Sequence, residues 1–291
     1  MAERIYIPKD KNLLDPKVDS TFKTLFIQEG QSSKIALKSI IKAAIGYEPE
    51  TVEVINNELP KDIENAKNIR LDLQCRMSDG ERIGIEMQTC RDGDDLTARS
   101  FYYGCKMVSS LGLSGRTYME IPKVYQIIFT NFNLFGEKSR YLYDFSMRSE
   151  ELQLTDKLQI IFIQMPLVKE RDRDVETLSD IEKWVIFLRD STDKNQRDLL
   201  NRIMDTNEGI REAGEILMAI SEDEREWVRQ ETRLKAEYDY QSSILTAHKK
   251  GLKEGLEEGL ETAARGMKVK KIPTEIIMEV TGLTAEQVAA L

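Results

Sequence analysis

A change of hydrophobic period near Thr51 constrains the fold more than any other feature of this sequence. Residues 15–45 place apolar side chains three and four positions apart, which predicts helices. Beyond Thr51, apolar and polar side chains alternate, which predicts strands separated by turns. The alternating segments are TVEVINNEL (51–59), NIRLDLQCRM (68–77) and RIGIEMQTC (82–90). Helices followed by paired strands indicate an α/β fold.

The chain continues in this way up to Pro166 and then changes character. The further elements that we expect are a helix over 94–113, a buried strand over 124–132, and strands over 139–147 and 157–166. After Pro166 the sequence is highly charged and has helical spacing. We therefore expect an α/β fold with a mixed sheet flanked by helices and a C-terminal helical region. Its expected parts are a core at 1–168, a helical subdomain at 169–245 and a tail at 246–291.

The histidine and cysteine counts exclude several kinds of chemistry. The chain has one histidine, His248, so a site built from several histidines is excluded. Its three cysteines contain no C-x-x-C pair, which argues against a zinc cluster or a disulfide framework and favours reduced thiols in the cytoplasm. The glycine-rich motifs of nucleotide-binding sites do not occur either. If the protein is an enzyme, we expect its chemistry to depend on carboxylates.

Hydropathy and charge limit the partners of the protein. No apolar run approaches the roughly 20 residues that span a bilayer, and the N-terminus lacks the apolar centre of a signal peptide. We therefore expect neither membrane insertion nor export. The net charge is −9, but residues 1–168 carry 22 basic and 24 acidic side chains and are close to neutral. A local basic groove for DNA is compatible with that part of the chain.

Two acidic residues on neighbouring predicted strands form the candidate site. In the segment IRLDLQCRMSDGERIGIEMQ, Asp72 and Glu86 both lie on the polar faces of their strands. A two-residue turn would set Asp72 opposite Met87 and mix the two faces. A three-residue loop ending at Gly80 sets Asp72 opposite Glu86 and gives Gly80 the left-handed position of such loops. The apolar face of the first strand is then expected to hold Leu71, Leu73, Cys75 and Met77.

Two directly opposed carboxylates, with Cβ atoms roughly 5 Å apart, repel each other and need compensation. A hard divalent cation supplies it, because Mg²⁺ is typically held by one or two carboxylates together with substrate phosphate. Such an ion can activate water and stabilise the charge that develops on a phosphodiester. The alternative is a solvated polar sheet face on which the two acids merely coexist.

The order of these motifs resembles the PD-(D/E)XK nucleases. Asp72 and the segment Glu86-Met87-Gln88 lie on consecutive predicted strands, after an N-terminal helix and before a helix–strand pair. More narrowly, the chain resembles the Rpn family of recombination-promoting nucleases, which are also described as transposases. The matching segments are LLDPKVDSTFKTLF, LDLQ, IEMQ, ARSFYYGCKMVSSL, YMEIPKVYQIIFTNFNLF, GLKEGLEEGLE and TGLTAEQVAAL. The resemblance implies a metal-dependent deoxyribonuclease that cuts DNA in recombination or in mobile elements.

The resemblance also assigns roles to individual residues. Asp72 and Glu86 would bind the ion, which we expect to be Mg²⁺, with Mn²⁺ or Ca²⁺ as alternatives. Gln88 stands where the wider superfamily has lysine, so it can orient water or phosphate by hydrogen bonds but lacks a positive charge. We expect Lys23 or Lys106 to supply that charge.

Residues on the flanking helices complete the expected site. Asp19 matches an acidic position in the first helix of the superfamily, where it would be an outer metal contact. The alternative is that it only begins the helix and interacts with the helix dipole. On the helix after the acids, Arg99, Tyr102 and Lys106 lie at i, i+3 and i+7. This stripe would bind the DNA backbone, with Arg and Lys on phosphate. The alternative is a solvated face with a half-buried tyrosine.

The tail contains a small glycine repeat. Gly251, Gly255 and Gly259 recur four positions apart, so they lie nearly on one face of a helix. This face would form a close helix–helix contact, or would belong to a frayed linker helix. We expect a homo-oligomer through the C-terminal region, and a second hypothesis is a non-catalytic interaction protein on a nuclease-like scaffold. Two short helices are expected at the end of the chain, with a capping box at Thr284 and Gln287.

Overall fold

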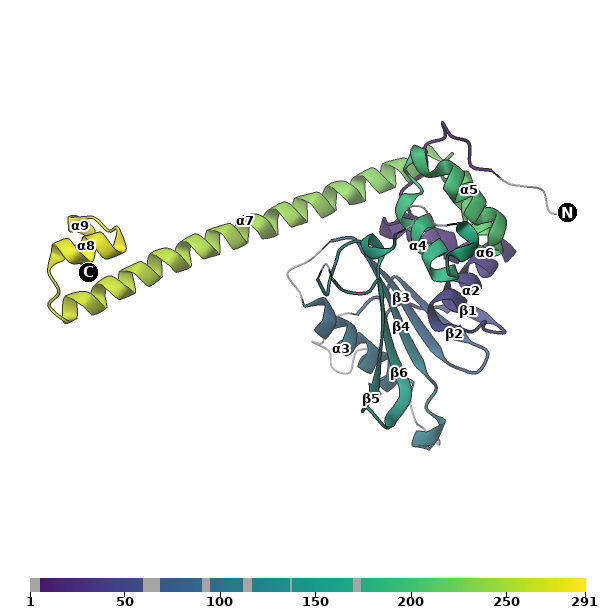
Figure 1. The fold of residues 1–291 in the computed structure, drawn as a ribbon, viewed down its shortest axis with the longest axis horizontal. Coiled ribbons are helices and arrows are strands. Elements are labelled where there is room, and N and C mark those ends of the chain that lie inside the picture. The colour runs from purple at the N-terminus through teal and green to yellow at the C-terminus, as the bar shows by residue number, and fades with distance from the viewer. Residues whose placement is uncertain (1–5, 60–68, 91–94, 112–116, 137, 170–173) are drawn as a thin grey trace. The chain divides into compact units, whose positions relative to one another are not determined.

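Six strands form one mixed sheet in the part of the chain that the structure describes (Figure 1). The structure is a computed structural model and describes residues 6–59, 69–90, 95–111, 117–136, 138–169 and 174–291. The sheet order is β1-β2-β3-β4-β6-β5, and the strands are β1 Val52–Ile55, β2 Leu73–Met77, β3 Arg82–Gln88, β4 Val124–Thr130, β5 Leu142–Arg148 and β6 Gln153–Gln164. Neighbours β3, β4 and β6 run parallel, and the other pairs are antiparallel. The predicted mixed α/β sheet is confirmed.

Helices cover both faces of this sheet (Figure 1). They are α1 Asp19–Ile27, α2 Gln31–Ile45, α3 Leu96–Ser109, α4 Asp180–Asp190, α5 Arg197–Thr206 and α6 Glu208–Ile220. α3 packs on β4 and β6, whereas the other five helices share a core with the opposite face of the sheet. Parts of two predicted elements, at Asn68, at Asp94 and at 112–113, lie outside the described residues.

Each face of the sheet has its own hydrophobic core. Along β4, Ile127 and Phe129 belong to the larger core under the helical layer, and Ile128 belongs to the smaller core under α3. Every residue of β4 is buried, as expected for a strand that is covered on both sides. Glu86 lies on the α3 face and is also buried. The alternative of a solvated polar sheet face is therefore wrong for this residue.

The expected orientation of Leu71 is also wrong. Leu73, Cys75 and Met77 lie in the larger core as predicted, but Leu71 lies in the smaller core under α3. The pairing of β2 with β3 begins only at Leu73, and the chain bends at Asp72. The alternation of a strand does not continue through a bend, so Leu71 turns to the other face.

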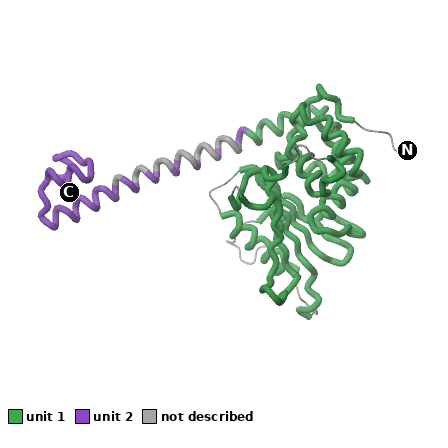
Figure 2. Tube along the Cα trace, in the orientation of Figure 1, with its two compact units in different colours: residues 1–234 green, residues 235–291 purple. Residues whose placement is uncertain are grey.

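The chain divides into two compact units, residues 1–234 and 235–291 (Figure 2). The remaining helices are α7 Glu224–Val269, α8 Thr274–Thr281 and α9 Ala285–Ala290. In the second unit, α8 and α9 pack with the end of α7 around Ala264, Ile277 and Val288. The two predicted short helices and the capping box at Thr284 are confirmed. The three-part division at residues 168 and 245 stays a prediction.

The glycine repeat lies within α7. No atom of another segment of the described chain lies within 4 Å of the position that a Cβ would take at Gly251, Gly255 or Gly259. The neighbouring Leu252 and Leu256 are exposed. This face of α7 therefore has no packing partner among the described residues of its own unit. None of the described helices, α7 included, has the length and apolar character needed to cross a bilayer.

Candidate active site

The hairpin of β2 and β3 brings the two predicted acids to one place. Leu73 pairs with Ile85, which confirms the register expected for a three-residue loop. In that loop Gly80 has a φ of +87°, a left-handed conformation that glycine adopts at little cost. Because Asp72 directly precedes β2, the same register places it beside Glu86.

Asp72 is held at the bend before β2 by the neighbouring strand. Its Oδ2 accepts a hydrogen bond of 2.8 Å from the backbone N–H of Met87. Burial raises the pKa of the Asp72 carboxyl to about 6, and the negative charge of Asp19 also raises it, whereas the bond from Met87 and the charge of Lys23 lower it. The positive charge near Asp72 is therefore too small to offset the cost of burying its ionised form.

Glu86 is the more deeply buried acid, with 4% of its surface exposed. Burial and the charge of Asp72 raise its pKa to about 7, and Arg99 with the amides of Gln88 and Gln126 acts in the opposite direction. Its Oε1 is buried and has no hydrogen-bond partner among the described residues. A buried carboxylate oxygen without a partner is costly, so this atom is available to a cation.

Gln88 links Glu86 to α3. Its Nε2 donates to Glu86 Oε2 at 3.2 Å, and its Oε1 accepts from the Arg99 Nη2 at 2.8 Å. A guanidinium cannot accept a hydrogen bond, so the amide oxygen must face Arg99 and the amide nitrogen is left to face Glu86. Arg99 thus fixes the orientation of Gln88. It also brings to the site a positive charge that the amide lacks.

Lys23 reaches the site from α1. Its Nζ lies 3.6 Å from Asp72 Oδ1 and also forms an ion pair with Asp19, one helical turn earlier. Asp19 pairs in addition with Arg233, from the start of α7. Burial raises the pKa of Asp19, but Lys23 and Arg233 outweigh this effect and bring it below its usual value. Asp19 is therefore ionised at neutral pH and shares its cation with Asp72.

The Asp72 and Glu86 carboxylates fit a hard divalent cation. They offer only oxygen donors, the kind that Mg²⁺ prefers, and Glu86 Oε1 lacks any other partner among the described residues. No group of three or more His, Cys, Asp or Glu side chains suited to an ion occurs in the described ranges. A cation bound here would use two protein carboxylates and complete its shell with water or phosphate oxygens.

The other predicted DNA-contacting residues of α3 differ in exposure. Tyr102 is 53% exposed, and its ring centre lies 6.4 Å from that of Tyr103. Lys106 is only 7% exposed, because it lies on the buried side of α3 together with Met107. The expected stripe is therefore interrupted at Lys106. Contacts of Arg99 and Tyr102 with DNA stay a prediction.

Two residues near the acids were missed in the sequence. Gln126 of β4 pairs with Gly84 and is fully buried, and its amide helps to lower the pKa of Glu86. A glutamine inside the apolar run VYQIIFTNF was a usable signal, because a buried amide needs a partner. Arg233 gave no such signal, since it contacts Asp19 across 214 positions of sequence.

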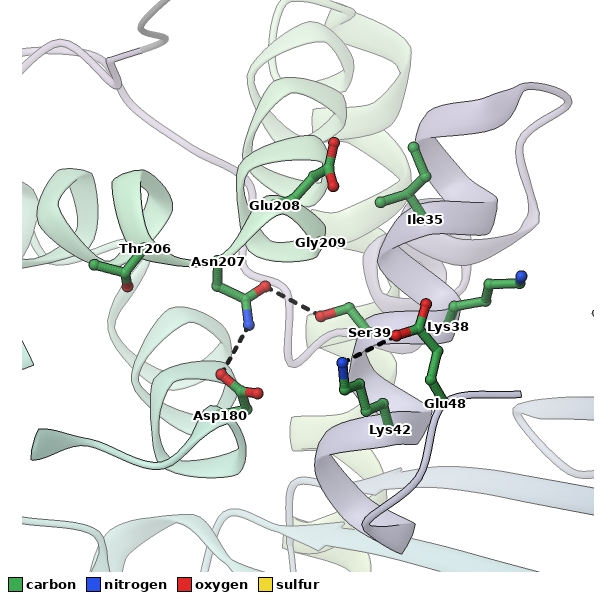
Figure 3. A pocket seen from close by; sticks show the side chains of 10 residues that line it. All are labelled: Ile35, Lys38, Ser39, Lys42, Glu48, Asp180, Thr206, Asn207, Glu208 and Gly209. Carbon is green, nitrogen blue, oxygen red and sulfur yellow. Dashed lines mark hydrogen bonds and ion pairs between the residues drawn. The ribbon is translucent and has the colours of Figure 1, made fainter. Parts of the chain in front are cut away.

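A separate pocket of about 430 Å³ lies between α2 and the start of α6, in the helical layer (Figure 3). Its polar side chains bind each other. Lys42 pairs with Glu48 at 2.9 Å, and Asn207 bonds both Ser39 and Asp180, at 3.1 and 3.2 Å. None of the predicted site residues lines this pocket. The acid pair stays the candidate active site.

Comparison with known proteins bears on the family of the chain. The chain matches no curated protein and no solved structure at a significant level. A model of the PD-(D/E)XK nuclease family transposases matches residues 16–247, which include the whole sheet and both acids. The resemblance predicted from the sequence is confirmed, and the chain belongs to the PD-(D/E)XK nuclease family transposases.

Proposed function

We propose that the protein is a metal-dependent DNA endonuclease in which Asp72 and Glu86 bind the ion. The observation that carries this proposal is a pair of buried carboxyls, placed side by side by the β2–β3 hairpin, whose pKa values are raised to about 6 and about 7. Two adjacent carboxyls with raised pKa values need added positive charge to ionise together. Lys23 is shared with Asp19, so a divalent cation supplies that charge more fully.

The roles of the other residues follow from their contacts. A bound Mg²⁺, or Mn²⁺ or Ca²⁺ in its place, would supply a Lewis acid and a water of lowered pKa for phosphodiester hydrolysis. Gln88, held by Arg99, would orient that water or a phosphate oxygen through its amide N–H. Lys23 and Arg99 would attract the phosphate oxygens of the substrate. Asp19 would hold Lys23 in place or act as an outer contact of the ion.

DNA is the proposed substrate, and membership of a nuclease family of transposases supports it. The part of the chain that carries the acids is close to electrically neutral, so it does not repel a polyanion strongly. The exposed Tyr102 beside Arg99 offers a surface for the DNA backbone. We place the activity in recombination or in the movement of mobile elements, in the cytoplasm.

Cleavage of supercoiled plasmid tests this proposal. Wild type, Asp72→Ala and Glu53→Gln are compared with Mg²⁺, Mn²⁺ or Ca²⁺ and with EDTA. Glu53 is a matched control because it is an exposed carboxylate on β1 of the same sheet, paired with Arg76. We expect metal-dependent nicking by wild type and by Glu53→Gln, and its loss in Asp72→Ala. Equal nicking by wild type and Asp72→Ala would rule out the assignment.

A second candidate is a non-catalytic interaction protein that self-associates through its C-terminal region. The unpartnered glycine face of α7, next to the exposed Leu252 and Leu256, favours it. Sedimentation equilibrium of the full chain measures this property directly. A homo-oligomer without metal-dependent cleavage would support the second candidate over the first, whereas a monomer at all concentrations would exclude self-association.

A further inference from the structure

An aromatic groove of about 360 Å³ lies on the α3 side of the sheet, apart from the acid pair. Its lining residues are Thr97 and Phe101 of α3, Phe135 after β4, Phe145 of β5, and Ile160 and Phe162 of β6. The rings meet edge to face, with centres 5.4 Å apart for Phe135 and Phe162 and 6.1 Å apart for Phe145 and Phe162. The groove is thus walled by aromatic rings.

Three phenylalanines of this groove are more exposed than the other phenylalanines of the protein. Its sequence has nine phenylalanines, all within the described residues, and the three exposed ones all line this groove. Phe101 is 51% exposed, Phe135 37% and Phe145 45%. Several exposed rings gathered in one place mark a binding surface rather than scattered surface residues. The ligand expected from this chemistry has a flat apolar face.

The strand register places the groove level with the acids. Glu86 pairs with Ile128 of β4, and Ile128 pairs with Phe162 of β6. Neighbouring strands lie about 4.8 Å apart, so the Cα atoms of Glu86 and Phe162 are separated by roughly 10 Å across the sheet. On α3, Arg99 contacts the acid site, while Thr97 and Phe101 on either side of it in sequence line the groove. A strand of DNA at the acids would therefore pass the groove within a nucleotide or two.

Two basic residues follow Phe135 of the groove in the sequence. They are Lys138 and Arg140, three and five positions further along the chain. Lys138 and Arg140 are exposed. Basic side chains near exposed aromatic rings are the usual arrangement for single-stranded nucleic acid, because bases stack on the rings and the cations bind the backbone phosphates.

We propose that this groove binds an unpaired nucleobase of the DNA strand that is cleaved at the acid pair. The inference rests on the proposed function and names its substrate class. In an intact duplex the bases lie inside the stack and cannot reach a protein ring without being unpaired. The protein therefore prefers DNA with a single-stranded tail or flap beside the scissile phosphate. The exposed faces of Phe101 and Phe145 stack on the base, and Lys138 and Arg140 bind its flanking phosphates.

Binding measured without metal tests the groove separately from catalysis. Fluorescence anisotropy compares the full-length protein, in EDTA, on three labelled DNAs: a blunt duplex, the duplex with a short single-stranded tail, and the duplex with a tail of abasic sites. The abasic tail keeps the phosphates and removes the bases. We expect the base-containing tail to bind about 5- to 150-fold more tightly than the abasic tail, the range typical of stacking one base on an aromatic ring.

Variants assign that difference to the groove. Phe145→Ala and Phe101→Ala should each lose most of the preference for bases, while Tyr6→Ala, an exposed aromatic residue outside the groove, should keep it. Thermal melting checks that each variant is folded. The inference would be overturned if wild type bound the base-containing and abasic tails equally, or if both Phe variants kept the preference for bases. Equal affinity for the two tails is also the result expected if the groove binds a protein segment instead. Plasmid cleavage tests the proposed function independently, because it requires metal and the acids.

Discussion

At the residue scale, the site is defined by two carboxyls that the fold forces together at an energetic cost. Burial raises the pKa values of both Asp72 and Glu86, and the negative charge of Asp72 raises the pKa of Glu86 further. A fold that only needed stability would place apolar or amide side chains here. The cost is understandable if a cation binds the pair and offsets both effects.

This argument predicts that Glu86→Gln stabilises the metal-free protein at high pH. The pKa of Glu86 is raised to about 7 in the folded state, so folding is favoured by its protonated form. The free energy of unfolding of wild type should then fall as the pH rises from about 4.5 to 7, by up to about 3 kcal/mol from this group. Urea unfolding in EDTA at pH 5 and pH 8 should show a gain for Glu86→Gln only at pH 8. An equal change at both pH values, or the same gain for the exposed control Glu53→Gln, would contradict the account.

Arg99→Ala tests whether the arginine positions Gln88. Without the bond from Arg99 the amide can rotate, so its N–H no longer points steadily to the site. We expect kcat for DNA cleavage to fall about 10- to 100-fold, the range typical of residues that orient a metal site, with a smaller change of KM. Arg76→Ala, which removes an exposed arginine of β2, should leave kcat unchanged. A change confined to KM would indicate a role in binding DNA alone.

The register of the acids could be predicted from the sequence, because face alternation and loop length allow only one pairing. The contacts of Gln126 and the burial of Lys106 could not, since both depend on how α3 lies across the sheet. The contact of Arg233 with Asp19 could not be predicted for a related reason. Nothing in a local pattern shows that the start of α7 returns to α1.

At the element scale, the helical layer depends on a close contact between α2 and α6. A Cβ at Gly209 would stand 2.1 Å from the Cβ of Ser39, so only glycine fits there without a shift. Ser39 also accepts a hydrogen bond from Trp184 Nε1 and donates one to Asn207, which caps α6. The side chain of Ser39 therefore connects α2, α4 and α6.

Gly209→Ala should consequently destabilise the protein, by about 1 to 3 kcal/mol if the helices must move apart. Gly251→Ala is the matched comparison, because no other segment in the described chain lies near it and alanine favours helix by about 0.5 to 1 kcal/mol. Thermal unfolding should show a lower Tm for Gly209→Ala and no loss for Gly251→Ala. Equal Tm values for Gly209→Ala and wild type would show that the contact is loose.

Most elements could be predicted from hydrophobic period alone, because the strands and helices here are strongly patterned. The lengths of several strands differ from the prediction: β1 and β2 are shorter, whereas β6 is longer and begins at Gln153 rather than at Lys157. Its first residues are exposed and pair only with β5, so they carry no apolar alternation to mark them. Backbone hydrogen bonds to β5, which depend little on the side chains, extend β6 over these residues.

At the scale of the whole molecule, residues 1–234 and 235–291 are separate compact units, and both acids lie in the first. Helices α4, α5 and α6 share one hydrophobic core with α1, α2 and the sheet. The ion pair of Arg233 with Asp19 and the bond of Gln230 with Thr21 are also internal to the first unit. Catalysis should therefore not require the second unit.

A chain that ends at Leu234 should fold and retain metal-dependent plasmid cleavage at a rate similar to that of the full chain. It should also sediment as a monomer if the C-terminal region forms the homo-oligomer that we propose. Circular dichroism, plasmid cleavage and sedimentation measure the three properties. Loss of the folded state, or a folded but inactive protein, would show that the second unit contributes to the site.

The most direct test of the central claim is a Mn²⁺ titration followed by electron paramagnetic resonance, because it reports ion binding without any substrate. Wild type should bind Mn²⁺ saturably, and Glu53→Gln should match it. Glu86→Gln and Asp72→Asn should each bind much more weakly while their melting curves show a folded protein. Equal Mn²⁺ binding by wild type and Glu86→Gln would contradict the claim that Asp72 and Glu86 form the metal centre of this nuclease.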